Sequence, residues 1–135
     1  YDEAKAFYGR LMPALGMERV FDSSDFCYFV GGRTALGLQP CDPAYARECF
    51  IQGRVGLHHL CFRARLRTDV DQVAALLGDM NAHIVSPAKE GHWAPGYYYV
   101  LFEDPDGIRV EVNFVPGPGV LAEEVSFNPG DDWKK

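Results

Sequence analysis

The sequence has no apolar run long enough to cross a membrane and no excess of basic residues. None of its hydrophobic stretches approaches the roughly 20 residues that span a bilayer, and no basic start leads into an apolar segment as in a signal peptide. Thirteen Lys and Arg face 19 Asp and Glu, a formal net charge of -6 that opposes binding to nucleic-acid phosphates. We therefore expect a cytoplasmic protein with neither a membrane nor a nucleic acid as its partner.

The sequence also lacks the cysteine spacing of a metal or redox motif. The four cysteines include no Cys-x-x-Cys pair, and Cys27 and Cys61 each lie in an apolar, strand-like run. This pattern predicts reduced thiols. Two disulfides in a secreted domain are the alternative.

What the sequence does contain is enough apolar material for one domain. The chain has 135 residues, of which 47% are hydrophobic and 13% aromatic. Apolar periodicity predicts a helix over 2–15, strands at 19–21, 26–30 and 34–39, a short helical piece over 43–50, a strand at 56–64, a helix over 68–80, and strands at 83–85, 97–103 and 108–114.

The two halves of this element order match, except at their beginning. Residues 1–53 predict a helix and three strands, whereas residues 54–115 predict a strand, a helix and three strands. The sequence therefore predicts a single α+β domain of two repeated modules, the first without its opening strand. Residues 116–135 form an acidic tail that begins in Pro and Gly and is expected to lie along the surface.

Strand alternation places two reactive side chains on one side of the predicted sheet. In 56–64 and 108–114 alternate positions are apolar, and the positions between them are mostly polar. These intervening positions hold His59, Cys61, Arg63, Arg109, Glu111 and Asn113. We expect His59 and Glu111 to point away from the helix-covered face toward one shared site, and His58 to point to the opposite, apolar face.

The turn between the last two strands predicts which residues face this site. Residues 105–107 are Pro-Asp-Gly, which suits a three-residue turn with glycine in the left-handed position. That register places Leu101 opposite Glu111 and Tyr99 opposite Asn113. A four-residue turn would instead bring the even-numbered residues of the preceding strand to the site.

Two runs of this sequence resemble the vicinal oxygen chelate superfamily, namely GLHHLCF at 56–62 and YYVLFEDPDGIRVE at 98–111. Asp-Pro-Asp-Gly followed four residues later by Glu is the more specific signal. This superfamily contains glyoxalase I, methylmalonyl-CoA epimerase, fosfomycin-resistance transferases, extradiol dioxygenases and bleomycin-binding proteins. The resemblance extends to about residue 114 and implies two βαβββ modules that form a curved mixed-sheet cup.

The same resemblance implies a divalent metal ion, which could be Zn, Mn, Fe, Ni or Co. His59 matches the histidine ligand of the second module, and Glu111 matches the closing glutamate ligand. The corresponding position of the first module falls near Gly37, which cannot bind metal, and Gln39 is a weak substitute. The fosfomycin-resistance branch tolerates this gap, because it takes a histidine from the opening strand instead.

Three functions are compatible with the resemblance. The first is a metal-dependent lyase, isomerase or transferase of the glyoxalase type, in which Glu111 also moves a proton on a small oxygenated substrate. The second is a metal-free protein that binds a small molecule, as in the bleomycin-resistance branch. The third is an extradiol dioxygenase with Fe(II) or Mn(II), which requires a second histidine ligand.

The remaining expectations concern the substrate and the partner chain. The residues expected to contact the substrate are Cys61, Arg63, His92, Trp93, Tyr99, Leu101 and Asn113. The loop that carries His92 and Trp93 would either cover the mouth of the cup or stay exposed. The resemblance also implies a homodimer, and an incomplete first module would leave a strand edge for a further strand or a partner to cover.

Overall fold

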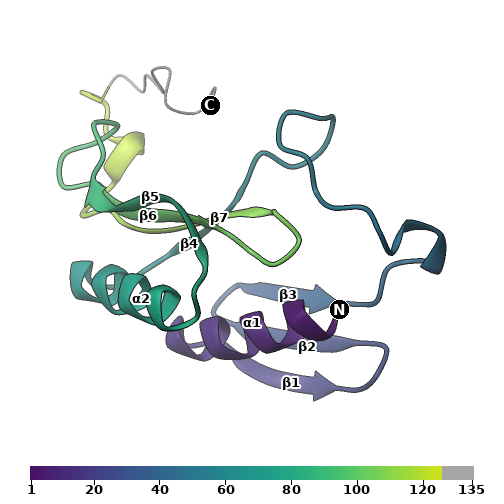
Figure 1. Cartoon of the computed structure of the whole chain (residues 1–135). Coiled ribbons are helices and arrows are strands. Elements are labelled where there is room, and N and C mark those ends of the chain that lie inside the picture. Colours follow the sequence, from purple (N-terminus) through teal and green to yellow (C-terminus); the bar gives the residue numbers. More distant parts are fainter. Residues whose placement is uncertain (126–135) are drawn as a thin grey trace.

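The computed structural model describes residues 1–125, so half of the surface tail predicted for 116–135 lies outside the described residues (Figure 1). The elements are, in order, α1 (Asp2–Ala14), β1 (Glu18–Asp22), β2 (Cys27–Gly31), β3 (Thr34–Leu38), the short 3-10 helix η1 (Pro43–Tyr45), β4 (Leu60–Arg63), α2 (Arg67–Asp79), β5 (His83–Glu90), β6 (Tyr98–Glu103), β7 (Arg109–Phe114) and the 3-10 helix η2 (Gly119–Leu121). Within residues 1–125, no helix is both long and apolar enough to span a bilayer.

The strands form two sheets, each with one helix from the same half of the chain (Figure 1). The first sheet has the order β1-β2-β3 and is antiparallel throughout. The second has the order β4-β7-β6-β5, in which β4 lies parallel to β7. This arrangement confirms the α+β class. Among residues 1–125, β3 pairs only with β2, so the first sheet has no counterpart of β4.

The core lies between the two helices and the apolar faces of both sheets. The fully or nearly fully buried side chains include Tyr8, Leu11, Met12, Cys27, Phe29, Val70, Val73, Leu77, Val100, Phe102, Val110 and Val112. In α1 and α2 they recur every three or four residues, and in the strands at every second residue, as one-sided burial requires. The opposite face of β4 and β7 is therefore available for polar side chains.

A buried carboxylate ties α1 to the turn between β6 and β7. The hydroxyl of Tyr8 donates to Asp104 Oδ2 at 2.8 Å, and the backbone amides of Asp106 and Ile108 donate to Asp104 Oδ1 at 2.9 Å. Burial raises the pKa of Asp104, and the hydrogen bonds oppose this shift. This network holds the turn in one conformation.

The same turn sets the register that the sequence predicts. Gly107 has φ 86°, the left-handed conformation expected of it. Leu101 pairs with Glu111 and Tyr99 with Asn113, so the three-residue turn is confirmed. The odd-numbered residues of β6 accordingly share a face with Glu111.

Two strand boundaries differ from the prediction. The strand expected at 56–64 begins only at Leu60, because Gly53 and Gly56 have positive φ and residues 52–58 form turns and bends. The strand expected at 83–85 continues to Glu90 as β5, with irregular register against β6. Pro87 is tolerated there because β5 is an edge strand, whose outward N–H groups have no sheet partner.

Two helical predictions also need correction. The helix predicted over 68–80 begins one residue earlier, at Arg67, and Leu66 is its N-cap residue. Asp69 still stabilises this end, since its carboxylate accepts the Leu66 amide at 2.9 Å. The helical piece predicted over 43–50 shrinks to the single turn η1.

Candidate functional site

The polar face of β7 forms the floor of the candidate site. Glu111 and Asn113 are only 7% and 3% exposed, although both carry polar groups that need partners. Cys61 of β4 pairs with Glu111, so its thiol lies on the same side. These three side chains, together with Tyr97 from the loop before β6, are called the polar cluster below.

The two oxygens of Glu111 have different surroundings. Oε1 accepts the Tyr97 hydroxyl at 2.5 Å, the Asn113 amide at 2.7 Å and the Cys61 thiol at 3.7 Å. The Asn113 amide also donates to the Tyr97 hydroxyl at 2.7 Å. Oε2 instead faces His59, whose Nε2 lies 3.8 Å away. The polar cluster thus holds one oxygen, and the other points to the imidazole.

His59 reaches this position from the segment immediately before β4. The sequence predicts His59 within a strand. In the structure it lies outside β4, yet its ring lies beside Glu111. The expectation that His58 points to the opposite face is wrong. Strand alternation does not apply before Leu60, and the Nδ1 atoms of His58 and His59 lie 2.6 Å apart. Burial lowers the pKa of His59, while the Glu111 carboxylate acts in the opposite direction.

The lowered pKa of His59 predicts a pH-dependent stability. The unfolded chain takes up this proton near its ordinary pKa of 6.5, before the folded protein does. The free energy of unfolding should therefore fall as the pH decreases from above 6.5 toward the lower, folded-state pKa, below which this contribution no longer changes. We expect this decrease to be weaker in His59→Gln, measured by urea unfolding between about pH 7.5 and pH 5.5. Parallel stability curves for the two proteins would contradict the prediction.

Tyr97 belongs to the site, although the residues that the sequence predicts to contact the substrate do not include it. The usable signal was alternation, since Tyr97 is two residues before Tyr99 and falls on the same side of the chain. Burial and the hydrogen bond to Glu111 raise the pKa of its phenol, so it remains a donor at neutral pH.

The thiol of Cys61 is held in its protonated form. Crowding by the surrounding protein and the nearby Glu111 carboxylate raise its pKa to about 12, although the residue remains solvent-accessible on an open face. We therefore do not expect a nucleophilic role for Cys61.

An aromatic wall stands next to the polar cluster. The ring of Trp93 lies 4.9 Å from that of Tyr97 and 5.1 Å from that of Tyr99, both edge to face. His92 is exposed, with its ring 5.0 Å from Trp93. The loop that carries His92 and Trp93 therefore contributes Trp93 to this wall.

Of the other residues on this face, Leu101 lies opposite Glu111, whereas Arg63 and Arg109 contact other parts of the chain. Leu101 is partly buried opposite Glu111, as predicted. Arg63 donates from Nη1 to the carbonyl of Val115 at 3.3 Å, and Arg109 lies 3.7 Å from Glu103. Both arginines thus have contacts within the chain.

The geometry of His59 and Glu111 is compatible with a shared metal ion. Ligand atoms lie about 2.0–2.2 Å from such an ion, so two of them are at most about 4.4 Å apart. The separation of 3.8 Å falls within this limit. Among residues 1–125, no group of three His, Cys, Asp or Glu side chains is placed to hold an ion. The described chain therefore brings together two side chains whose chemistry suits a metal ion.

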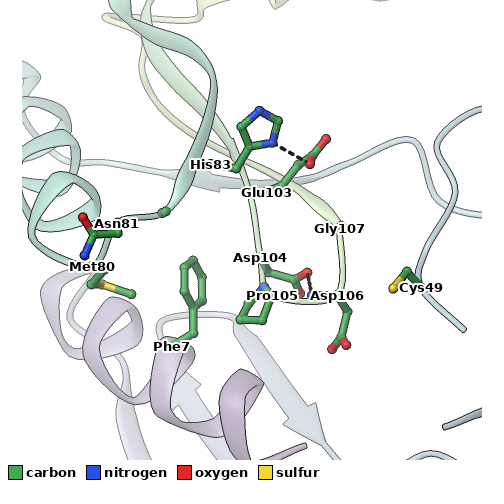
Figure 2. Close-up of a pocket in the computed structure, with 11 residues that line it drawn as sticks. Phe7, Cys49, Met80, Asn81, His83, Glu103, Asp104, Pro105, Asp106 and Gly107 are labelled. Atoms are coloured by element: carbon green, nitrogen blue, oxygen red, sulfur yellow. Dashed lines mark hydrogen bonds and ion pairs between the residues drawn. The ribbon is translucent and has the colours of Figure 1, made fainter. Parts of the chain in front are cut away.

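Two hollows lie near these elements. One, of about 340 Å³, separates β3 from β4 and is lined in part by Leu36, Cys61 and Arg63. Figure 2 shows the other, of about 490 Å³, beside the turn at the far end of β6 from Tyr97. Its main polar groups already have partners, because His83 binds Glu103 at 2.8 Å and Asp104 binds the turn. The first hollow adjoins the polar cluster, whereas the second is separate.

Comparison with known proteins agrees with this architecture. The chain is 26% identical over 112 residues to the uncharacterized protein YqjT of Bacillus subtilis (strain 168), an alignment that covers 82% of this chain and 88% of that protein. A candidate glyoxalase from Bacillus halodurans superposes with a TM-score of 0.72 at 29% identity, over 84% of this chain and 86% of that one. Lactoylglutathione lyase from Agrobacterium tumefaciens superposes with a TM-score of 0.56 at 27% identity, over 84% of each chain.

The family assignment rests on a match that spans most of the chain. Residues 1–112 match the model of the Glyoxalase/Bleomycin resistance protein/Dioxygenase superfamily, a range that includes both helices, six complete strands and Glu111. The chain belongs to this superfamily.

Proposed function

We propose that this chain is a cytoplasmic, divalent-metal-dependent enzyme that acts on a small oxygenated substrate. The observation that supports this proposal most directly is the approach of His59 Nε2 to Glu111 Oε2 at 3.8 Å. An imidazole with a lowered pKa is neutral near pH 7 and can donate its lone pair, and a carboxylate supplies negative charge. Both groups suit Zn, Mn, Fe, Ni or Co.

When bound, such an ion would polarise the vicinal oxygens of the substrate and so acidify the neighbouring C–H group. We assign the acceptance of that proton to Glu111, because the polar cluster orients its carboxylate and leaves Oε2 facing His59. This role corresponds to a lyase or isomerase of the glyoxalase type. The likeness to a lactoylglutathione lyase supports the same reaction class.

The substrate would lie against the aromatic wall and the odd-numbered residues of β6. Trp93 and Tyr99 offer ring surface, and Leu101 lies directly opposite Glu111. Cys61 and Asn113 form the polar floor, and Arg63 and His92 are further residues that we propose to contact the substrate. We include a homodimer in this proposal, with the second chain covering the edge of β3.

The test is the metal content of the purified protein. Wild type purified without chelator should retain close to one equivalent of a divalent metal by elemental mass spectrometry. His59→Ala should retain much less, because it removes one of two ligands supplied by residues 1–125. His92→Ala is the matched control, since it removes an exposed histidine outside the polar cluster. Negligible metal in both wild type and His59→Ala would refute metal dependence.

A metal-free binding protein is the second candidate, and two observations favour it. Residues 1–125 contain no group of three potential ligands, and Trp93, Tyr97 and Tyr99 form an aromatic surface beside the polar cluster. Such a site can hold a planar or amphipathic molecule by ring contact and hydrogen bonds alone. In that case ligand binding would survive the replacement of Glu111, whereas a metal-dependent activity would not.

A further inference from the structure

We propose that Tyr97 is a positioning residue, whose hydroxyl holds Oε1 of Glu111 so that Oε2 alone is presented to His59 and to a bound ion. This inference rests on the proposed metal site and adds a residue to it. Tyr97 acts through Glu111 and is not itself a ligand.

The first support is the distribution of hydrogen bonds over the carboxylate. A carboxylate oxygen has two lone pairs, and Oε1 already accepts strong donors from Tyr97 at 2.5 Å and Asn113 at 2.7 Å. The thiol of Cys61 is a weaker and more distant third donor. Oε1 is therefore occupied by the protein, and the carboxylate cannot rotate without breaking these bonds.

The second support is that Tyr97 restrains Glu111 from outside its own strand. Asn113 lies only two residues from Glu111 on β7, so its amide moves with that strand. Tyr97 precedes β6 and closes the loop 91–97 through two backbone hydrogen bonds, to Gly91 and to Ala94. Its hydroxyl thus joins this loop to the centre of β7.

The third support is the packing that holds the Tyr97 ring in place. The ring stands edge to face against Trp93 at 4.9 Å and near Tyr99 at 6.0 Å. A Cβ atom at Gly91 would lie 2.6 Å from the Trp93 ring and 3.0 Å from Tyr97 Cδ1, so a side chain there would displace both rings. The packing of this loop therefore holds the Tyr97 hydroxyl next to Glu111.

Removing only the hydroxyl tests this role, and the chain offers a matched control. Tyr97→Phe keeps the ring and removes one hydrogen bond to a carboxylate. Tyr98→Phe removes the same kind of bond on the surface, where Tyr98 donates to Asp71 at 2.7 Å. We expect Co²⁺ affinity to fall about tenfold in Tyr97→Phe, the loss typical of a residue that orients a metal ligand, and to be unchanged in Tyr98→Phe.

A second readout on the metal-free protein separates this inference from the proposed function. In protein labelled with ¹³C at the glutamate carboxyl carbons, the Glu111 signal should shift in Tyr97→Phe but not in Tyr98→Phe. If wild type binds no Co²⁺ while this shift occurs, the metal site is refuted and the positioning role stands. An unshifted Glu111 signal, or measurable Co²⁺ binding of equal affinity in wild type and Tyr97→Phe, would overturn the positioning role.

Discussion

Glu111→Gln should leave the protein folded but weaken its binding of a divalent ion by at least about 100-fold, more than the about 10–100-fold typical of an outer-shell partner. The glutamine oxygen can still accept hydrogen bonds from Tyr97 and Asn113, so the polar cluster retains most of its contacts. The variant lacks the negative charge next to His59 and the base that would accept a proton. Zn²⁺ titration by calorimetry measures the first loss, and thermal unfolding checks the fold.

Glu103→Gln is the control for this experiment. Glu103 lies on the same sheet and also approaches a histidine, with His83 Nδ1 at 2.8 Å, but at the other end of β6. We expect its Zn²⁺ affinity to equal that of wild type. If both variants behave like wild type, Glu111 is not a metal ligand.

Glu111→Gln also distinguishes the two candidate functions. Fluorescence of anilinonaphthalenesulfonate reports binding of an aromatic anion to an apolar surface such as the wall of Trp93 and Tyr99. A metal-free binding protein should bind this probe, or another aromatic ligand, with similar affinity before and after Glu111→Gln. A protein that loses Zn²⁺ affinity and a metal-dependent activity together fits the enzyme.

Phe102→Ala should lower the free energy of unfolding by about 3–5 kcal/mol. Phe102 is fully buried in β6, and its ring centroid lies 6.2 Å from that of Phe7 in α1, so the truncation leaves a cavity where the two halves of the chain meet. A domain of this size is stable by about 5–15 kcal/mol in total, and the variant is therefore expected to be marginal. Urea unfolding gives the value directly.

Phe21→Ala is the matched control for this stability prediction. Phe21 is 53% exposed on β1, and its ring centroid lies 6.1 Å from that of Phe26. Its truncation therefore creates no closed cavity. We expect a loss below about 1 kcal/mol. Comparable losses in the two variants would mean that the core does not lie where the structure places it.

Much of the architecture could be predicted from local pattern. Helical and strand periodicity predicted both helices and all seven strands, although all five residues of β1 are exposed. The turn at 105–107 predicted the pairing of Leu101 with Glu111, because Gly107 can adopt a left-handed conformation that other residues rarely adopt. Periodicity was less informative about where each strand begins and ends, because these boundaries depend on pairing with neighbouring strands.

The candidate site includes contacts that a local sequence pattern does not predict. Strand alternation alone predicts that Glu111 and Asn113 share the polar face of one strand, since alternation is a property of the extended backbone. The contact of Tyr97 with Glu111 and the approach of His59 from outside β4 arise from the three-dimensional packing of the chain. Such contacts join segments 14 and 52 residues apart, and their geometry depends on how loops pack against the sheet, which no short-range periodicity encodes.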